Sequence, residues 1–371
     1  MKVATFNVEN LFDRAKAFNQ KNTLSSKIIT AAAELNNIFE KKLYSANDKK
    51  EIKKLFKILG LEKSDKGKYA ILRKIRGKIV ARPKNKPIKV YANGREDWIG
   101  WIELRTEPVN EIAVLNTGKV IRDVDADILA VIEAEDRTSL EMFSNYILKK
   151  IGGRPYSEVM LVDGNDNRGI DVGIMCKRNY KIGTLRSHIY DLKSNKQPIF
   201  SRDCPEYEID TPSGEKVIII PNHFKSKYGG DNIKSRNKRK AQAKRAAEIY
   251  KRLVSEGYDN VIILGDLNDT PDSKPLKPLL KDTDLKDVSE HPTFDTGKYK
   301  GIGTYALGND SSKIDYLLVS TILFTKIKSC GLFRKGAWPG KRPVRWETYV
   351  DIKREIHVAS DHHVIWAEFD L

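Results

Sequence analysis

The sequence predicts an α/β protein whose β-sheets are buried. Short, nearly continuous apolar runs recur along the chain as candidate strands, with helical patterns between them. Strands of this composition are typical of sheets that are covered on both faces. Most of the runs end in Asn, Glu, His or Asp, as in FNVEN, AVIEAE, PNHF and LGDLND. We therefore expect polar side chains to gather at one sheet edge, which should carry the functional site.

The core elements follow from apolar periodicity. Residues 3–8 form the first predicted strand, and apolar residues at helical spacing predict a helix over about residues 25–42. The core resumes near residue 127 with strands and helices in alternation. The strand patterns are ILAVIEAE, IDVGIMCK, KVIIIPNHF, NVIILGDLND, IDYLLVS and the terminal run VIWAEF, and the helical ones are residues 139–150 and 235–254. We expect a single domain over residues 1–371.

An insertion interrupts this pattern. A short basic amphipathic helix is predicted at residues 49–61, and residues 68–107 contain β-rich pieces, with Asn93-Gly94 as a hairpin signal. We interpret about residues 43–110 as a basic, β-rich inserted subdomain. Tyr69, Tyr91, Trp98 and Trp101 are interleaved with its charges, which suits contact with nucleic acid, although a solvated structural elaboration is the alternative.

The charge of the chain is large and uneven. The net charge is +17, and residues 40–95 hold 19 Lys and Arg against 5 Asp and Glu. Residues 225–252 hold 11 against 2. Such charge indicates an anionic partner, either nucleic acid or an acidic membrane surface.

Several classes of protein are disfavoured by the sequence. Three cysteines without metal-ligand spacing support neither a disulfide framework nor a zinc site. No apolar run approaches the ~18 residues that a transmembrane helix needs. The sequence starts with a strand pattern instead of a signal peptide. We expect a cytoplasmic protein, monomeric by default.

Six motifs carry a family resemblance. In chain order, TFNVEN, AVIEAED, PNHFKS, ILGDLND, KIDYLLVS and ASDHH resemble the endonuclease/exonuclease/phosphatase superfamily, which includes deoxyribonuclease I, exonuclease III, neutral sphingomyelinases and inositol-polyphosphate phosphatases. The resemblance covers residues 1–13 and 123–371 but not the insertion. It implies a four-layered α/β sandwich of two packed mixed sheets flanked by helices, and metal-dependent hydrolysis of phosphodiesters.

The resemblance implies a set of metal ligands. Glu133 matches the metal-binding glutamate of the family, and Asn7 matches the asparagine of its first strand. Asp361 matches an acid on the metal side, and Glu9 falls on an acidic position that assists in some members. Mg²⁺ is the expected ion, with Mn²⁺ or Ca²⁺ as alternatives, because such ions prefer oxygen ligands. For Glu133 the alternative is a solvated acid.

The resemblance also implies catalytic residues. Asp266 and Asn268 match the pair that positions the attacking water, although an Asx turn would explain the same sequence. His223 matches a phosphate-contacting histidine of the deoxyribonuclease I and sphingomyelinase branch. Asp315 matches the aspartate that orients the catalytic histidine, here His362, which alone could be part of a surface turn. Either His362 or Asp266 is the general base.

Three basic residues are candidates for binding substrate phosphate. Arg168 lies in the loop DGNDNRG, where an ion pair with the neighbouring acids is the alternative, and Asp171 follows it. Lys225 and Lys227 follow His223 closely and are expected to steer an anionic substrate. His188, His291, His357 and His363 are expected to be structural or surface residues.

These observations favour a Mg²⁺-dependent phosphodiesterase that acts as a nuclease on DNA or RNA. The first alternative is a phosphoesterase for lipid headgroups or small phosphate esters, because the fold and the metal site do not select the substrate. The second is a nucleic-acid-binding module without activity, which the complete set of acids and histidines disfavours.

Overall fold

The computed structural model describes residues 1–9, 11–15, 22–84, 86–166, 168–227 and 231–371. The chain forms two compact units. We call the first the sandwich unit; it comprises Met1–Phe12, Val109–Lys227 and Asp231–Leu371. The second, the inserted unit, comprises Asp13–Pro108. Each has its own hydrophobic core.

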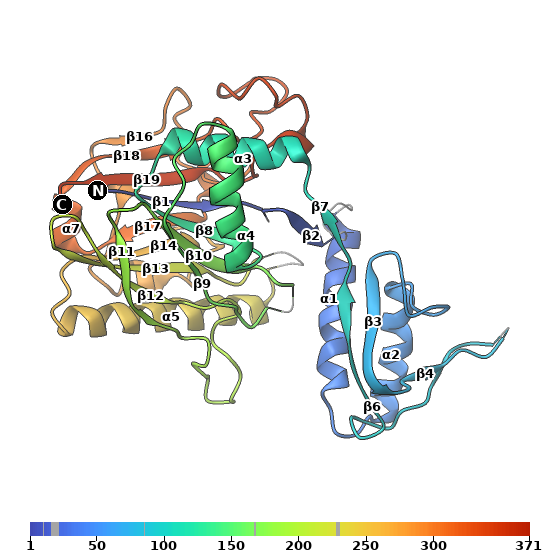
Figure 1. Cartoon of the computed structure of the whole chain (residues 1–371). Helices are drawn as coiled ribbons and strands as arrows, with labels where there is room; N and C mark the ends of the chain where they lie inside the picture. Colours follow the sequence, from blue (N-terminus) through green and yellow to red (C-terminus); the bar gives the residue numbers. More distant parts are fainter. Residues whose placement is uncertain (10, 16–21, 85, 167, 228–230) are drawn as a thin grey trace. The chain divides into compact units, whose positions relative to one another are not determined.

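Two mixed sheets form the centre of the sandwich unit (Figure 1). Within the described residues, the first sheet has seven strands in the order β16 (Phe294–Asp295), β18 (Ile327–Phe333), β19 (Val364–Phe369), β1 (Lys2–Asn7), β8 (Ile128–Ala134), β10 (Asp171–Cys176) and β9 (Glu158–Leu161). The second has six, in the order β11 (Lys181–Arg186), β12 (Glu206–Asp210), β13 (Lys216–His223), β14 (Val261–Asp266), β17 (Asp315–Val319) and β15 (Lys286–Asp287). Each sheet has a central parallel pair, β1 with β8 and β13 with β14.

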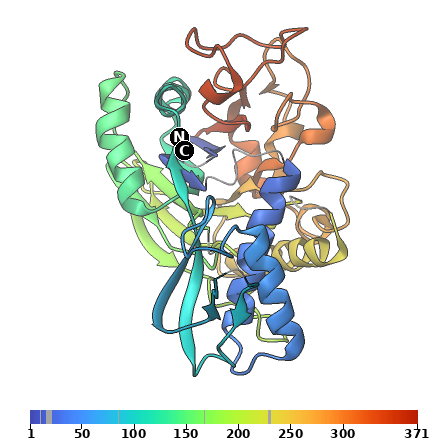
Figure 2. The same cartoon turned by 90° about the vertical axis from the view of Figure 1, so that its right-hand side faces the viewer.

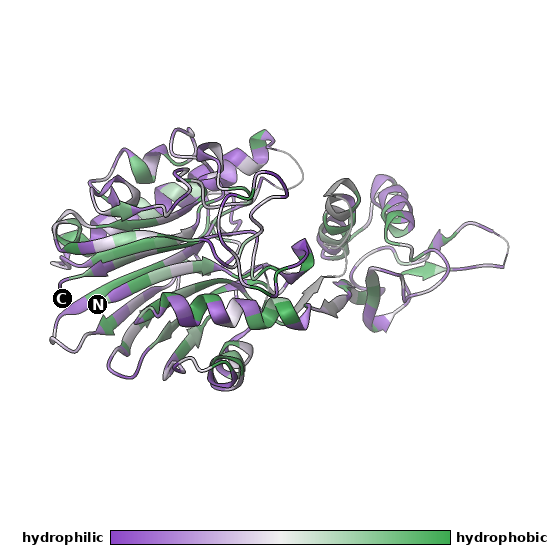
Figure 3. Cartoon of the chain, turned by 90° about the horizontal axis from the view of Figure 1, so that it is seen from above, coloured by the Kyte–Doolittle hydropathy of each residue, from purple (hydrophilic) through white to green (hydrophobic). Residues whose placement is uncertain are grey.

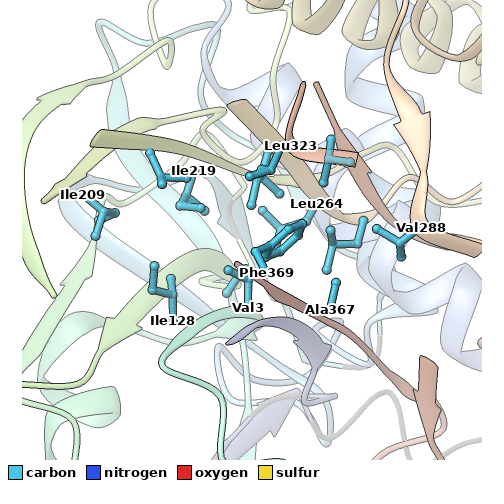
Figure 4. Packing of buried hydrophobic residues seen from close by; sticks show 14 of the residues in the cluster. Val3, Ile128, Ile209, Ile219, Leu264, Val288, Leu323, Ala367 and Phe369 are labelled. Carbon is cyan, nitrogen blue, oxygen red and sulfur yellow. The ribbon is translucent and has the colours of Figure 1, made fainter. Parts of the chain in front are cut away.

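The main core lies between the two sheets (Figure 4). Side chains alternate along each strand, so that Val3 and Ile128 of the first sheet and Ile219 and Leu264 of the second all face this core. The strands are correspondingly hydrophobic along their length, whereas the connecting loops are mostly hydrophilic (Figure 3). This arrangement explains why the strands appear in the sequence as nearly continuous apolar runs.

Helices cover the outer face of each sheet. On the first sheet lie α3 (Glu111–Val124), α4 (Arg137–Met142) and its π-helical continuation Phe143–Leu148. On the second lie α5 (Ile233–Ser255) and α6 (Lys277–Leu280), and a short helix, α7 (Thr321–Thr325), follows β17. The order of layers is therefore helices, sheet, sheet, helices, which confirms the predicted four-layered sandwich.

Helix α5 shows how the sequence defines one of these layers. Asn232 caps it by accepting a hydrogen bond from the backbone N–H of Ser235. Its buried apolar stripe includes Ala243, Ala246, Ala247, Tyr250 and Leu253. Val254 is exposed, because it lies in the last turn beside the helix end.

The inserted unit is a small α/β structure (Figure 2). Its helices α1 (Asn22–Phe39) and α2 (Ala46–Ile58) lie side by side. Its strands pair antiparallel as β3 (Ala70–Gly77) with β6 (Trp98–Leu104), β4 (Val80–Ala81) with β5 (Lys89–Val90), and β2 (Asp13–Ala15) with β7 (Thr106–Pro108).

Two details of the insertion were predicted wrongly. Its start was expected near residue 43, but the compact unit begins at Asp13, because α1 packs into the same core as α2 and β6. Asn93-Gly94 does not form a hairpin turn, because β5 pairs with β4, and β6 pairs with β3.

Candidate active site

Five of the predicted site residues lie at the ends of the central strands. Asn7 is the last residue of β1, and Glu133 is the next-to-last residue of β8. In the second sheet, His223 and Asp266 are register partners at the ends of β13 and β14. Asp266 is in turn the register partner of Asp315, the first residue of β17. A hydrogen bond of 3.4 Å from Asn7 Nδ2 to Asp266 Oδ2 joins the two sheets at this edge.

Glu133 reaches the site through a β-bulge. Leu129 and Val131 of β8 face the helices, and simple alternation would turn Glu133 the same way. The φ angle of Glu133 is instead +67°, and the register with β10 shifts beside it. Its Oε1 consequently lies 3.6 Å from His223 Nε2, on the side that faces the other sheet. Glu133 is therefore not a plain solvated acid at a strand end.

Asp266 and Asn268 form a rigid pair. Asp266 Oδ1 accepts a hydrogen bond of 2.8 Å from the backbone N–H of Asn268, as in an Asx turn. Its Oδ2 accepts one of 2.9 Å from Asn268 Nδ2. Burial, together with the nearby Asp315 carboxylate, raises the pKa of Asp266 to about 8. Asp266 therefore closes the Asx turn with Oδ1 and contacts the other site residues with Oδ2.

His362 is held by Asp315. The distance from His362 Nδ1 to Asp315 Oδ2 is 2.8 Å, and both side chains are buried. This contact directs Nε2 of the imidazole away from Asp315, and Asp361 Oδ1 lies 3.8 Å from Nε2. Burial alone would lower the pKa of His362, but the Asp315 carboxylate outweighs it and the pKa is raised well above its usual value.

His223 has a different environment from His362. Its Nε2 lies 3.6 Å from Glu133 and 3.6 Å from Asp266. Burial lowers the pKa of His223 well below its usual value, and Arg202 and Arg168 act in the same direction. Within the part of the chain that the structure describes, His223 Nδ1 is buried without a hydrogen-bond partner. The surroundings thus shift the pKa values of the two histidines in opposite directions, down for His223 and up for His362.

The donor atoms of the site suit a hard divalent cation. Among the described residues, ligand atoms of Asp266, Asp315 and His362 lie within 4.8 Å of one another. Asn7 and Glu133 both adjoin Asp266 from the first sheet. Buried carboxylates this close together repel one another unless a cation or protons compensate them. A set dominated by carboxylate and amide oxygens fits Mg²⁺ better than it fits a soft metal.

The two remaining predicted ligands lie beside this group. Asp361 is on the His362 side, and its side chain is 40% exposed. Glu9 has a φ angle of +50°, and its backbone N–H donates to Asn7 Oδ1 at 3.1 Å. The Asp361 carboxylate raises the pKa of Tyr305, and the Glu9 carboxylate raises it further. Asp361 and Glu9 therefore lie around one tyrosine.

Arg168 forms an ion pair with a neighbouring acid, which was the alternative to its contacting substrate phosphate. Its guanidinium binds both carboxylate oxygens of Asp166, at 2.9 and 2.7 Å. Arg202, which is only 2% exposed, lies 3.2 Å from the same carboxylate. Asp171 accepts a hydrogen bond from the backbone of Gly164 and is buried. Asn167 of this loop lies outside the described residues.

The two candidate lysines differ in their surroundings. Lys227 Nζ forms an ion pair of 2.5 Å with Asp269, which also binds the buried Arg239. Burial, assisted by the neighbouring arginines, lowers the pKa of Lys225 to about 8. Residues 228–230, the glycine-containing end of the predicted steering loop, lie outside the described residues.

Three residues near the site were not identified from the sequence. Arg202 is not part of a recognisable sequence motif. It is identified only by its burial beside Asp166 in the structure. The ring of Tyr305 meets that of His362 edge-on at 4.9 Å. Thr304 Oγ1 accepts a hydrogen bond of 2.9 Å from the backbone N–H of Asp315. Tyr305 and Thr304 are placed by tertiary contacts, which no local pattern reveals.

Comparisons with known proteins place the chain in a family. The profile of the Endonuclease/Exonuclease/phosphatase family matches residues 83–335. Comparison with curated proteins gives no significant match. Among solved structures, mannosyl-6-phosphatase Bt3783 of Bacteroides thetaiotaomicron VPI-5482 is similar, with a TM-score of 0.51 and 16% identity over 70% of this chain and 90% of that one.

Other solved structures are similar as well. A family protein from Bacteroides thetaiotaomicron has a TM-score of 0.51 and 17% identity, over 69% of this chain and 89% of that one. The human Nocturnin catalytic domain with bound sulfate has a TM-score of 0.46 and 15% identity, over 71% and 89%. In the described part of the chain, no helix has the length and apolar character to cross a membrane. The chain belongs to the endonuclease/exonuclease/phosphatase family, whose members hydrolyse phosphate esters and generally use divalent metals.

Proposed function

We propose that this chain is a Mg²⁺-dependent phosphodiesterase that cleaves nucleic acid, DNA or RNA. The observation that carries the proposal is the convergence of both sheets on Asp266. Asn7, Glu133 and His223 approach this carboxylate from three strands, and Asn268 fixes its orientation. Beside it stands the buried Asp315–His362 pair. A binding module without activity would need neither feature.

A metal ion at this edge would be held by Asn7 and Glu133, with Asp361 and Glu9 as further oxygen donors. When bound, Mg²⁺ neutralises charge on the phosphoryl oxygens and on the leaving oxygen. The carboxylates are close enough to one another that a cation would also relieve their repulsion.

The side chains of this chain supply the remaining chemistry. Asp266, oriented by Asn268, accepts the proton of the attacking water. His362 presents its Nε2–H to a phosphoryl oxygen, because Asp315 occupies Nδ1 and favours the imidazolium. His223 binds a second phosphoryl oxygen. Of the two general bases that the sequence left open, this assignment favours Asp266, since an imidazolium has no free site for a proton.

Nucleic acid is the preferred substrate because of charge. The chain carries +17, and the inserted unit contributes 24 Lys and Arg against 11 Asp and Glu, a net charge of +13. A polyanion gains from many weak contacts of this kind, whereas a small phosphate ester does not. Arg168, Lys225 and Lys227 are the proposed phosphate contacts nearest the site, and Arg168 and Lys227 would exchange an intramolecular carboxylate for the substrate.

A substrate panel tests the proposal. Purified protein with Mg²⁺ should nick plasmid DNA or degrade RNA, and EDTA should abolish the activity. Asp266→Ala should slow turnover by about 10²–10⁴-fold, the range for loss of a general base. His362→Ala should slow it by about 10²–10³-fold, the range for loss of one hydrogen-bond donor to a developing oxyanion. Intact nucleic acid at low salt, together with hydrolysis of a sugar phosphate or sphingomyelin, would instead establish a small-ester or lipid-headgroup phosphoesterase, the alternative that the sequence left open.

A further inference from the structure

The β3–β6 ribbon of the inserted unit has two different faces. Trp98 and Trp101 lie on the same strand three residues apart, so strand alternation turns them to opposite sides. Trp98 is buried and Trp101 is 43% exposed. The ribbon therefore has an inner face that packs and an outer face that meets solvent.

The inner face is firmly anchored. The ring of Trp98 meets that of Phe39 edge-on at 5.0 Å, and its Nε1 donates a hydrogen bond of 3.1 Å to the Tyr44 hydroxyl. Leu72 and Ile102 of the ribbon are buried in the same core. Because this face is fixed by packing, the backbone that carries the outer face has a defined shape.

The outer face combines an indole with cations. Trp101 is the cross-strand partner of Arg73, whose guanidinium is held by a two-point contact of 2.8 and 2.9 Å with Glu103. A β-bulge lies between Lys74 and Arg76. It displays Ile75, which is 71% exposed. These side chains occupy one short stretch of the ribbon.

The positive charge next to Trp101 is only partly compensated by acids. Residues 71–82 hold five Lys and Arg and no Asp or Glu. Lys74, Arg76 and Lys78 are exposed, and in the described part of the chain none of them has an ion-pair partner. Of the acids on or next to the ribbon, Glu103 is already bound by Arg73, and Asp97, which precedes Trp98, accepts a hydrogen bond from the backbone N–H of Asn93. An anionic partner would supply the missing negative charge.

We propose that this outer face binds single-stranded nucleic acid, with a base stacked on Trp101 and phosphates bound by Arg76 and Lys78. Aromatic rings interleaved with cations are the common means of binding unpaired strands without sequence preference. A membrane-docking face would need a contiguous apolar patch, whereas Trp101 here stands opposite an arginine. The proposal rests on the proposed function in taking nucleic acid as the substrate, and adds a second place where the strand is held.

The test measures binding separately from cleavage. Fluorescence anisotropy of a labelled 20-nucleotide deoxythymidine strand is recorded with the full chain in EDTA, where no hydrolysis occurs. Trp101→Ala should weaken binding by about 5- to 150-fold, the range for stacking of one base on an aromatic ring. Trp101→Phe should retain most of the affinity, and a duplex of equal length should bind more weakly. The matched control is Tyr190→Ala, which removes an 86% exposed aromatic ring from the sandwich unit and should change nothing.

The cations are tested by salt dependence. The double variant Arg76→Gln, Lys78→Gln should lower the slope of log Kd against log salt by about 1.4, given ~0.7 for each phosphate contact of a single strand. Replacing Lys149 and Lys150 of the sandwich unit by Gln removes the same charge and should leave the slope almost unchanged. Equal effects of the two double variants would reduce the surface to a general electrostatic contribution and overturn the proposal.

Cleavage assays separate this proposal from the proposed function. All of these variants should hydrolyse bis(4-nitrophenyl) phosphate like the wild type. Wild-type cleavage of nucleic acid with unaltered strand binding in Trp101→Ala would overturn only the binding surface. Tight, Trp101-dependent binding without cleavage would overturn only the nuclease. Trp101-dependent binding to phosphatidylserine vesicles, with none to the oligonucleotide, would make the face a membrane contact and refute the proposal.

Discussion

Replacing Asp315 by Asn should separate the charge of this residue from its position. The amide oxygen of Asn can still accept the hydrogen bond from His362 Nδ1, which Asp315 now accepts at 2.8 Å. Only the negative charge is lost. His362 would then lose the partner that favours its imidazolium form, and with it the positive charge that we assign to binding a phosphoryl oxygen.

The magnitude follows from the geometry of the pair. The two charges are centred about 4 Å apart, and at an effective dielectric constant of about 20 their attraction amounts to about 4 kcal/mol. If this stabilisation is lost in the transition state, kcat falls about 10³-fold, since each 1.36 kcal/mol corresponds to a factor of about ten. Stability should change little, because Asp315 also faces Asp266 in register, and removing one of two buried carboxylates relieves their repulsion.

The assay is steady-state hydrolysis of bis(4-nitrophenyl) phosphate with Mg²⁺, paired with thermal unfolding. Asp315→Asn should lower kcat at an almost unchanged Tm. Asp282→Asn makes the same chemical change at an exposed ion pair with Lys277 and should leave both quantities as they are. A kcat within threefold of the wild type would refute the role of the charge. A large fall in Tm would show that Asp315 acts chiefly in folding.

Three further predictions concern residues around the site. Asp166→Asn leaves Arg202 buried without its charged partner and should lower stability by about 3–5 kcal/mol in urea unfolding. Burial opposes ionisation of Asp166, but its arginines outweigh this and lower the pKa, so the stabilisation should be present above about pH 4 and be lost as the pH falls further. Gly265→Ala should unfold the site, because the φ angle of Gly265 is +124° and an added Cβ would lie 2.1 Å from the Asn222 carbonyl oxygen. Thermal unfolding checks this, and a Tm equal to that of the wild type would contradict it. Because the pKa of Lys225 is lowered to about 8 by burial, the affinity for an anionic substrate, measured by binding in EDTA, should fall as the pH rises through 8, and Lys225→Met should lack this inflection.

The strands of the sandwich unit could be predicted because their signal is local. A run such as VIILGD is apolar throughout because both of its faces are covered, by the facing sheet on one side and by α5 and α6 on the other. Helix α5 is equally clear from its alanine stripe. The inserted unit was harder, because α1 belongs to it through tertiary contacts with α2 and with distant β6, such as the hydrogen bond from Asn36 to Ile102.

The sequence by itself determined which residues end the central strands. Asn7, His223 and Asp266 stand where apolar runs stop and Asp315 stands where one begins, and the family motifs assign them chemistry. This information is local because a polar residue at a strand end is tolerated only where the core gives way to solvent or to a ligand.

The tertiary structure alone decided how the site is assembled. Glu133 turns toward the other sheet only because of a bulge against β10, and bulges depend on which strands pair. The neutralisation of Lys227 by Asp269 and of Arg202 by Asp166 depends on loops from distant parts of the chain. Pairing, register and burial are properties of segments brought together, so no single stretch of sequence specifies them.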